Sequence, residues 1–246
     1  MVAAIIGGTG IHNLENVNLV KETVNTPYGE VTVDRNEDLI FLNRHAPDYS
    51  IPPHKINYRA NIKALQTLGV KRVCITYATG SLNPDFKLGV PVILNDFIDF
   101  TSGREHTFID SLAGDGGFIE MSQPFCPVMS QALADAAKEL ALEVRRGGVY
   151  GAVNGPRFET PAEIRAYRLH GVDVTGMTLV PEIPLALEAG MSCGAFAFSI
   201  NWAAGMSTNI EFVKDAVEET KQEMLKAMIA ALGNTKDEQC TPAIIL

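Results

Sequence analysis

Two polar groups that follow predicted buried strands can together recognise a flat heterocycle. The apolar run 148–153 is followed by Phe158 and Glu159, and the run 193–200 ends directly at Asn201. A carboxylate only accepts hydrogen bonds, whereas a carboxamide both donates and accepts. This pair suits a 6-oxopurine, whose N1–H donates while O6 and N7 accept, and an aromatic face suits its flat ring. Adenine presents an amino donor at position 6 beside an unprotonated N1, so it calls for a different pair.

The residues around Glu159 carry the signals of a helix start. Thr160 suits the N-cap, Pro161 suits the first helical position, and Glu163 falls where a capping-box carboxylate belongs. The pattern predicts that Phe158 and Glu159 lie between a strand and a helix, where α/β sheets place ligand-binding groups. From these residues alone a second interpretation stays open, in which Glu159 only complements the helix dipole and Phe158 belongs to the core.

Four other predicted strand ends carry small or polar groups that suit inorganic phosphate. Backbone N–H groups in a glycine turn can approach an anion closely, and arginine offers a forked set of donors. These groups are Thr9 in the turn 7–10, Arg44 with His45, Ala78 with Thr79, and Thr178. Each end taken alone also fits a tight turn or a pair of solvated charges, and spacing alone does not place them in one pocket.

Composition narrows the possible classes of protein. With 246 residues, 46% of them hydrophobic, the chain is long enough for one sizeable core, and its formal charge of −9 argues against nucleic-acid or anionic-membrane partners. The four cysteines are scattered and no acidic or histidine cluster resembles a metal site, so neither a metal nor another cofactor is expected. The absence of a leader or membrane-length apolar run predicts a cytoplasmic protein.

Strands alternate with helices along the chain, which predicts an α/β sandwich around one mixed sheet. We expect a single domain over residues 1–246, with a mobile polar tail over 234–246. The glycine-rich segment 101–123 is expected to be a functional or interface loop. The apolar periodicity predicts strands at 2–6, 31–33, 39–42, 73–77, 91–94, 148–153, 172–178 and 193–200. It predicts helices at 57–68, 128–143, 164–170 and 210–232, with a short one ending at Gly190.

Several sequence blocks, in order, resemble the trimeric purine nucleoside and methylthioadenosine phosphorylases over nearly the whole chain. The blocks are residues 6–10, 43–45, 52–61, 80–82, 96–99, 124–127, 155–160 and 176–182. The resemblance implies a single-domain three-layer α/β sandwich with a central mixed, partly barrel-like sheet. It further implies cleavage of a purine nucleoside by phosphate, with phosphate as co-substrate and no cofactor, in a homotrimer or a dimer of trimers.

Roles follow from the resemblance position by position. The residues that would hold phosphate are Thr9, Arg44, His45, Thr178 and the amide of Ala78. Those that would contact base and ribose are Phe158, Glu159, Met177 and Asn201, and the catalytic set would be Asn201, Glu159 and His45. The 5′ pocket would be formed by Ile210, Val213 and, from a neighbouring subunit, Phe118.

The chain departs from the adenine-cleaving members at two positions that contact the base. Asn201 and Ala203 stand where those members have an Asp-x-Asp, and Glu159 replaces a small hydroxyl residue. Both changes predict a 6-oxopurine nucleoside, and apolar Ile210 and Val213 favour a 5′-methylthio group. S-methyl-5′-thioinosine is therefore the expected substrate, with inosine and guanosine also considered.

Three alternatives remain: a methylthioadenosine phosphorylase, a nucleoside hydrolase, and an inactive nucleoside-binding or sensor module. Two residues leave their effects on the site open. Tyr77 stands where the methylthioadenosine enzymes commonly have a threonine that touches phosphate, and Lys214 lies beside the expected 5′ pocket.

Overall fold

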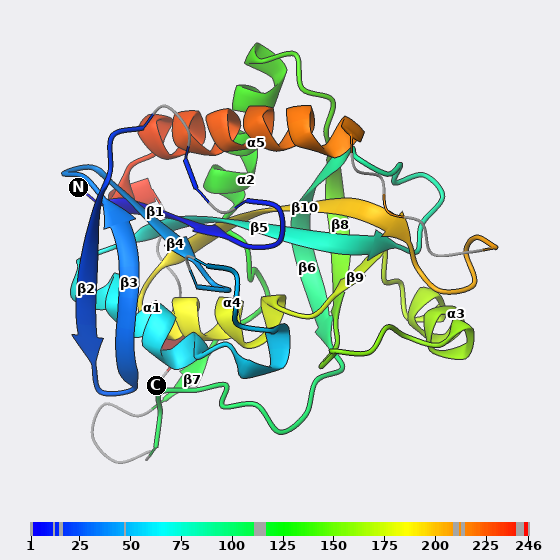
Figure 1. Cartoon of the computed structure of the whole chain (residues 1–246), viewed down its shortest axis with the longest axis horizontal. Helices are drawn as coiled ribbons and strands as arrows, with labels where there is room; N and C mark the ends of the chain where they lie inside the picture. Colours follow the sequence, from blue (N-terminus) through cyan, green and yellow to red (C-terminus); the bar gives the residue numbers. More distant parts are fainter. Residues whose placement is uncertain are drawn as a thin grey trace.

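A computed structural model describes residues 2–11, 13–14, 17–46, 48–110, 117–208, 212, 215–239 and 244–245. It confirms the predicted three-layer α/β sandwich (Figure 1). Helices α1 (Tyr58–Thr67) and α4 (Leu179–Glu188) cover one face of the sheet, and α2 (Pro127–Glu139) and α5 (Asp215–Asn234) cover the other. Helix α3 (Pro161–Leu169) lies at one end of the sheet. No helix in the described part of the chain is long and apolar enough to span a membrane.

The main sheet has nine strands in the order β10-β6-β8-β9-β5-β1-β4-β3-β2. Because β10 also pairs with β5, the strands from β10 to β5 close on themselves, which confirms the partly barrel-like sheet. In chain order the strands are β1 (Ala3–Gly7), β2 (Val20–Thr26), β3 (Gly29–Arg35), β4 (Leu39–Asn43), β5 (Arg72–Ser81), β6 (Pro91–Asp99), β8 (Arg145–Ala152), β9 (Val174–Gly176) and β10 (Ser192–Trp202). A separate pair joins β7 (Phe118–Ile119) to β11 (Ile244–Ile245).

One edge of β5 is left open in its middle. Strand β10 follows β5 along its length, from Ser192 opposite Arg72 to Trp202 opposite Ser81, so it occupies one edge. On the other edge, β1 runs parallel to residues 72–75 and β9 runs antiparallel to residues 80–81. The carboxyl ends of β1 and β9 therefore face each other across an opening at residues 76–79, which we call the β5 gap.

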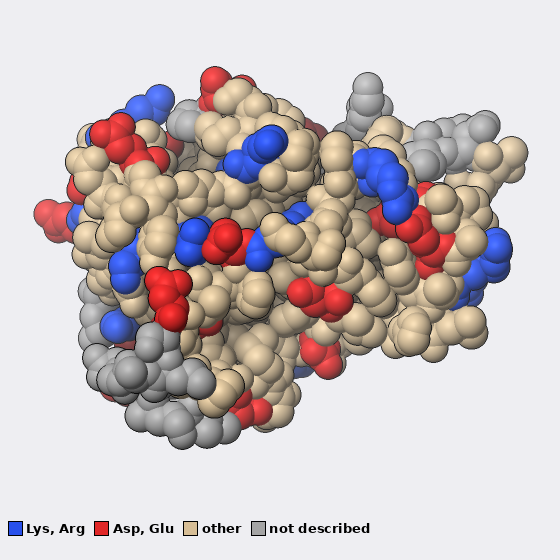
Figure 2. Space-filling view, turned by 90° about the horizontal axis from the view of Figure 1, so that it is seen from below, with Lys and Arg blue, Asp and Glu red and all other residues tan. Residues whose placement is uncertain are grey.

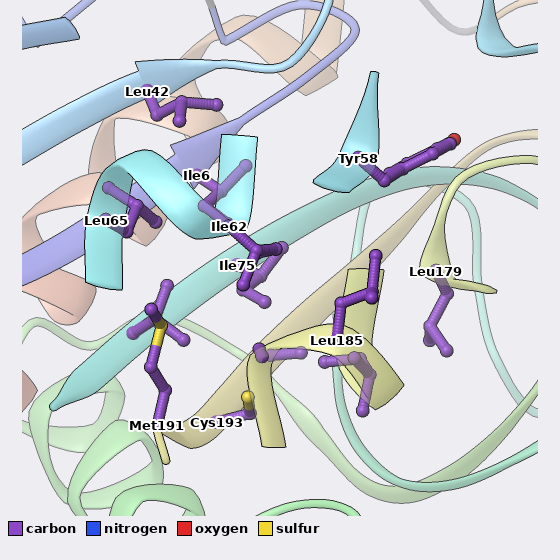
Figure 3. Packing of buried hydrophobic residues seen from close by; sticks show 14 of the residues in the cluster. Ile6, Leu42, Tyr58, Ile62, Leu65, Ile75, Leu179, Leu185, Met191 and Cys193 are labelled. Carbon is purple, nitrogen blue, oxygen red and sulfur yellow. The ribbon is translucent and has the colours of Figure 1, made fainter. Parts of the chain in front are cut away.

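The core explains why each helix packs where it does. Ile62 and Leu65 of α1, together with Leu185 of α4, pack with Ile6 and Ile75 of the sheet (Figure 3). A second cluster on the opposite face joins α2 and α5 to the same sheet, with Leu133, Phe196, Met224 and Met228 among its buried members. Met224 and Met228 of α5 thus belong to the core, where flexible thioether side chains fill irregular space.

The boundaries differ from the sequence predictions mainly where apolar patterning is weak. Strand β2 was not predicted because nearly all of its residues are exposed, so no alternating apolar face marks it. The predicted tail begins with an anchored segment, since the buried Arg72 side chain donates to Thr235 and Asp237. A short 3-10 helix covers Asp237–Gln239, and another covers Pro53–Lys55.

The predicted start of α3 is confirmed in detail. The Thr160 hydroxyl accepts a hydrogen bond from the Glu163 N–H, while the Glu163 carboxylate accepts one from the Thr160 N–H. Arg157 binds the same carboxylate through both terminal nitrogens, at 2.8 and 2.7 Å. These hydrogen bonds from Arg157 and from the Thr160 N–H lower the pKa of Glu163 to about 2. The segment that carries Phe158 and Glu159 is therefore fixed on its helix side.

Replacing Thr160 with alanine is expected to lower the free energy of unfolding by about 1 kcal/mol, because an N–H of the first helical turn loses its acceptor. Urea denaturation measures the change. The matched control is Thr67→Ala, at an exposed position in the last turn of α1 where the hydroxyl caps no helix N-terminus. Equal decreases in the free energy of unfolding of the two variants would show that the Thr160 cap does not stabilise the fold.

Candidate active site

A cavity of about 280 Å³ opens at the β5 gap. Its lining brings together every described residue predicted to hold phosphate, base or ribose. These are Thr9, Arg44, His45, Ala78, Phe158, Glu159, Met177, Thr178 and Asn201, and Thr79 joins them. The strand ends that sequence spacing could not place in one pocket meet there because β1 and β9 both stop at the gap.

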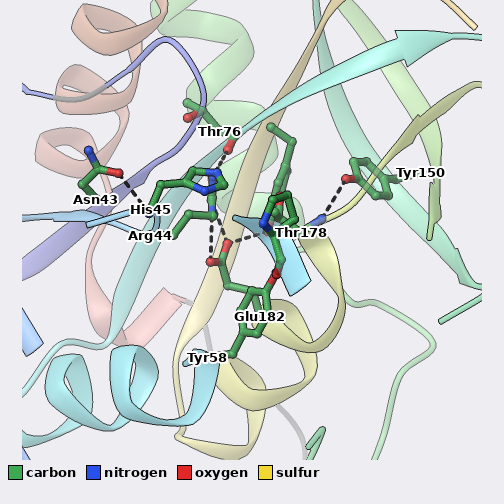
Figure 4. Close-up of polar contacts among 10 residues, drawn as sticks. Asn43, Arg44, His45, Tyr58, Thr76, Tyr150, Thr178 and Glu182 are labelled. Atoms are coloured by element: carbon green, nitrogen blue, oxygen red, sulfur yellow. Dashed lines mark hydrogen bonds and ion pairs between the residues drawn. The ribbon is translucent and has the colours of Figure 1, made fainter. Parts of the chain in front are cut away.

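The buried Arg44 guanidinium is held by Glu182 of α4. Arg44 Nε and Nη2 donate to the two carboxylate oxygens at 2.9 and 2.8 Å, while Nη1 donates to the Thr76 carbonyl at 2.9 Å (Figure 4). Burial opposes the charge on Arg44, but the attraction and hydrogen bonds of Glu182 outweigh it and raise the pKa of Arg44 further. Arg44 therefore stays charged, in a fixed orientation at the cavity wall.

Tyr77 completes this network by binding the same Glu182 oxygen that Arg44 Nη2 binds. Its hydroxyl donates to Glu182 Oε2 at 3.0 Å, and its ring lies 4.9 Å from the centre of the Arg44 guanidinium. Burial, reinforced by the negative charge of Glu182, raises the pKa of Tyr77 well above its usual value, so the phenol remains a donor. Tyr77 thus contacts the carboxylate that holds Arg44, and it is absent from the cavity lining given by the described residues.

The glycine turn after β1 allows Arg44 to approach the backbone. A Cβ atom on Gly8 would lie 2.0 Å from Arg44 Nη1, so a side chain at this position would displace the guanidinium. Beside it, the Thr9 hydroxyl lies 2.8 Å from the Tyr49 hydroxyl at the cavity wall. The glycine at position 8 is therefore required by the position of Arg44. From the sequence alone, this requirement could not be distinguished from that of a plain tight turn.

The Ala78 amide faces the β5 gap. Backbone groups of alternate residues in a strand point to the same edge, and the Thr76 carbonyl already meets Arg44 at the open edge. Ala78 lies two residues further along and lines the cavity. Its N–H is thus directed toward the region between Thr9 and Thr178, where an anion would be received.

His45 presents a defined tautomer. Its Nδ1 lies 2.7 Å from the Ile51 carbonyl oxygen, and because a carbonyl only accepts, Nδ1 carries a proton. The ring packs edge-on against Tyr49, with centroids 5.0 Å apart. Both contacts fix the plane of the imidazole at the cavity wall.

Thr178, the residue directly before α4, lines the cavity. Thr178 occupies the N-cap position, and its N–H donates to the Tyr150 hydroxyl at 3.4 Å. A Cβ atom on Gly176 would lie 2.1 Å from that same hydroxyl, so only glycine lets Tyr150 reach this position. The backbone at Val180 is not helical, so Thr178 contributes its hydroxyl to the cavity wall rather than the terminus of a regular helix.

The two predicted base-recognising groups lie on different strands around the same cavity. Glu159 is nearly buried, and its Oε1 accepts a hydrogen bond of 2.8 Å from the Thr175 hydroxyl of β9. Asn201 lies just after an irregularity in the pairing of β10 with β5, and its Nδ2 donates to the Trp202 carbonyl at 2.8 Å. Such irregularities commonly turn a side chain into a site.

The mouth of the cavity is aromatic. Phe158 is 48% exposed, and its ring centroid lies 6.3 Å from that of Phe212, which also lines the cavity. Phe212 was not predicted, although it stands between two residues that were. Those two, Ile210 and Val213, and the neighbouring Lys214 lie outside the described residues. Phe118 is 66% exposed on β7 and is not among the described residues lining this cavity.

Arg104 joins residues 153–154, which precede Phe158 and Glu159, to residues 177–180. Its guanidinium donates to the carbonyls of Asn154 and Met177, both at 2.9 Å, and to those of Val153 and Val180. No local pattern in the sequence indicates this contact, because Arg104 lies in an aperiodic loop. The buried contact of Glu182 has a clearer indication in the sequence. An acidic residue between apolar residues is expected to be buried and therefore to need a buried partner.

Comparisons with known proteins agree with this geometry. Residues 2–232 match the Phosphorylase superfamily. The chain is 44% identical to the 6-oxopurine nucleoside phosphorylase of Pyrococcus furiosus, covering 93% of this chain and 91% of the relative. It is 38% identical to the probable S-methyl-5′-thioinosine phosphorylase of Methanopyrus kandleri, covering 98% and 96%.

Solved structures show the same fold. The methylthioadenosine phosphorylase from Schistosoma mansoni in its apo form superposes with a TM-score of 0.87 at 31% identity, covering 96% of this chain and 92% of that chain. The family match spans nearly all of the elements that surround the β5 gap. This chain belongs to the phosphorylase superfamily.

Proposed function

We propose that this protein uses phosphate to cleave 6-oxopurine nucleosides, with S-methyl-5′-thioinosine as its main substrate and inosine and guanosine as further candidates. The products would be a hypoxanthine-type base and the corresponding ribose 1-phosphate, which makes the protein a pentosyltransferase. One observation carries the proposal: Glu159 and Asn201 line the same cavity as the cluster of Thr9, Arg44, His45 and Thr178. The relatives named above support this class of substrate.

At the base, Glu159 would accept the N1–H of a 6-oxopurine. The nearly buried carboxylate matches that donor, whereas the unprotonated N1 of adenine would leave it without one. Asn201 would donate to N7 or O6 as negative charge grows on the departing base. Its stabilising effect would thus increase toward the transition state, which is the condition for catalysis.

At the sugar, phosphate would attack C1′ as the bond from C1′ to N9 breaks. The electron pair of that bond leaves with the purine, and a phosphate oxygen forms the new bond to C1′. Thr9, Thr178, the Ala78 amide and Arg44 would fix the phosphate on the face opposite the base. Because these groups are already held in place, most of the rate enhancement would come from positioning and electrostatic preorganisation. This set favours phosphate over water as the nucleophile.

The 5′ end of the nucleoside would meet the aromatic mouth of the cavity. Phe158 and Phe212 offer apolar surface there, which suits a methylthio group better than a hydroxyl. Phe118, exposed on β7, would complete this pocket of a neighbouring subunit in a trimer. On the face shown in Figure 2, acidic and basic side chains are interspersed, consistent with a small-molecule substrate.

A substrate panel tests the reaction class and the base. With phosphate present, we expect kcat/KM for S-methyl-5′-thioinosine to exceed that for S-methyl-5′-thioadenosine by as much as about 10⁴-fold, since a buried group that loses its partner discriminates strongly. Ultraviolet absorbance follows release of the base. Equal cleavage of the two nucleosides would overturn the assignment, and cleavage independent of phosphate would indicate a hydrolase. No turnover of any nucleoside would indicate a binding module.

Replacing Asn201 with aspartate should reduce the 6-oxopurine preference, because the donor to N7 or O6 becomes an acceptor. We expect kcat/KM for S-methyl-5′-thioinosine to fall by about 100-fold, in the range seen when one transition-state donor is lost. The activity toward S-methyl-5′-thioadenosine should fall less. The control is Asn95→Asp, at an exposed position of β6. An unchanged substrate ratio in the Asn201 variant would show that this amide does not read the base.

Replacing Glu182 with glutamine should weaken phosphate binding more than nucleoside binding. The change removes the charge that balances and orients Arg44, and breaking a buried ion pair costs about 3–5 kcal/mol of stability. We expect the KM for phosphate to rise at least tenfold, while the KM for nucleoside changes less than threefold, in steady-state assays with each substrate varied. The control is Glu188→Gln on the same helix, which keeps an acceptor for the Phe108 N–H. Equal increases in both KM values would contradict a phosphate-specific role.

A further inference from the structure

Thr175 lies at a crossing point of the sheet beside the cavity. It is opposite Gly151 of β8 on one side and opposite Gly80 of β5 on the other. Its side chain is buried and lines the cavity. Among the described residues, its hydroxyl is the one hydrogen-bond donor to the Glu159 carboxylate, with Oγ1 at 2.8 Å from Oε1. The same oxygen lies 3.2 Å from the Gly151 carbonyl, which competes for the single hydroxyl proton.

Thr175 and Asn201 stand in the same row of the sheet. Gly80 is the register partner of both, in β9 and in β10. Two interstrand spacings separate the backbones of Thr175 and Asn201 by about 9–10 Å. Gly80 places no side chain between them, and all three residues line the cavity. The Asn201 amide nitrogen lies close above Gly80, 3.3 Å from where a Cβ atom would stand. The Thr175–Glu159 pair and the Asn201 amide therefore belong to neighbouring strands on either side of Gly80 at the same cavity wall.

We propose that Thr175 is a specificity-determining positioning residue, whose hydroxyl orients Glu159 so that its second carboxylate oxygen receives the N1–H of the base. This inference rests on the proposed function. Because the Thr175 hydroxyl donates to Oε1, Oε2 is left to accept from a second donor. This hydrogen bond also restricts rotation of the Glu159 carboxylate. The backbone of Glu159 is held separately, because it directly precedes the N-cap of α3. Thr175 acts only through Glu159.

Thr175→Val tests the inference, because valine keeps the shape of threonine and lacks the hydroxyl. We expect kcat/KM for S-methyl-5′-thioinosine to fall about tenfold or more, the usual effect of losing a hydrogen bond to a charged group. The ratio of kcat/KM for S-methyl-5′-thioinosine to kcat/KM for S-methyl-5′-thioadenosine should decrease. Thr175→Ser, which keeps the hydroxyl, should restore kcat/KM to within about threefold of the unsubstituted enzyme.

A double-mutant cycle separates this role from a purely structural one. In a Glu159→Gln background, Thr175→Val should cause less than a threefold further loss, because the partner through which Thr175 acts is already changed. If valine prevents folding, Thr175→Ala removes the same hydroxyl without placing a methyl group against the Gly151 carbonyl. The same comparison then applies.

Two results would overturn the inference. One is an unchanged ratio of kcat/KM for the two nucleosides in Thr175→Val. The other is an equal loss of kcat/KM on Thr175→Val in the Glu159 and the Glu159→Gln backgrounds. Either of these, found while the unsubstituted enzyme prefers S-methyl-5′-thioinosine, leaves the proposed function intact. If the unsubstituted enzyme shows no such preference, both the proposed function and this inference are wrong.

Discussion

The site depends on one constraint of the sheet, which is that β1 and β9 share an edge of β5 and approach each other from opposite directions. Residues 76–79 of β5 are then left open on that edge, and the loops after β1 and β9 both leave the sheet beside the opening. Parallel strands alone would direct their ends to one side of the sheet. The opposed arrangement instead brings Thr9 and Thr178 to the same open stretch of the β5 edge, and it presents the Ala78 amide between them.

The β5 gap places a buried charge next to unpaired backbone, and Glu182 makes that arrangement stable. Arg44 reaches across the opening to the Thr76 carbonyl, and its positive charge is balanced by a carboxylate from α4 that Tyr77 also binds. Removing any charge from a buried pair leaves the other unpaired at high cost. The result is a guanidinium whose position is set before any ligand arrives. Thr178, the residue directly before α4, lines the same cavity, so this segment contributes both Glu182 and Thr178 to its surroundings.

Much of the fold followed from local patterns. The strand-to-helix joint at Thr160 was predictable because capping chemistry is local, and its capping box is present. Strand β2 was missed because its side chains are mostly exposed and carry no apolar alternation. The cavity residues could be identified as strand ends, but their convergence depends on register and strand direction, which sequence spacing does not contain. The contacts of Glu182, Arg104 and Thr175 were missed for the same reason, since each joins segments far apart in the sequence.

In the proposed function, Glu159 recognises the N1–H of a 6-oxopurine. The most direct measurement is a calorimetric comparison of hypoxanthine with 1-methylhypoxanthine, which lacks that hydrogen, in the unsubstituted protein and in Glu159→Gln. N1-methylation should weaken binding at least tenfold in the unsubstituted protein. The Glu159 variant should show a smaller difference in affinity between the two bases. Equal affinity for the two bases in the unsubstituted protein would show that Glu159 does not recognise the N1–H.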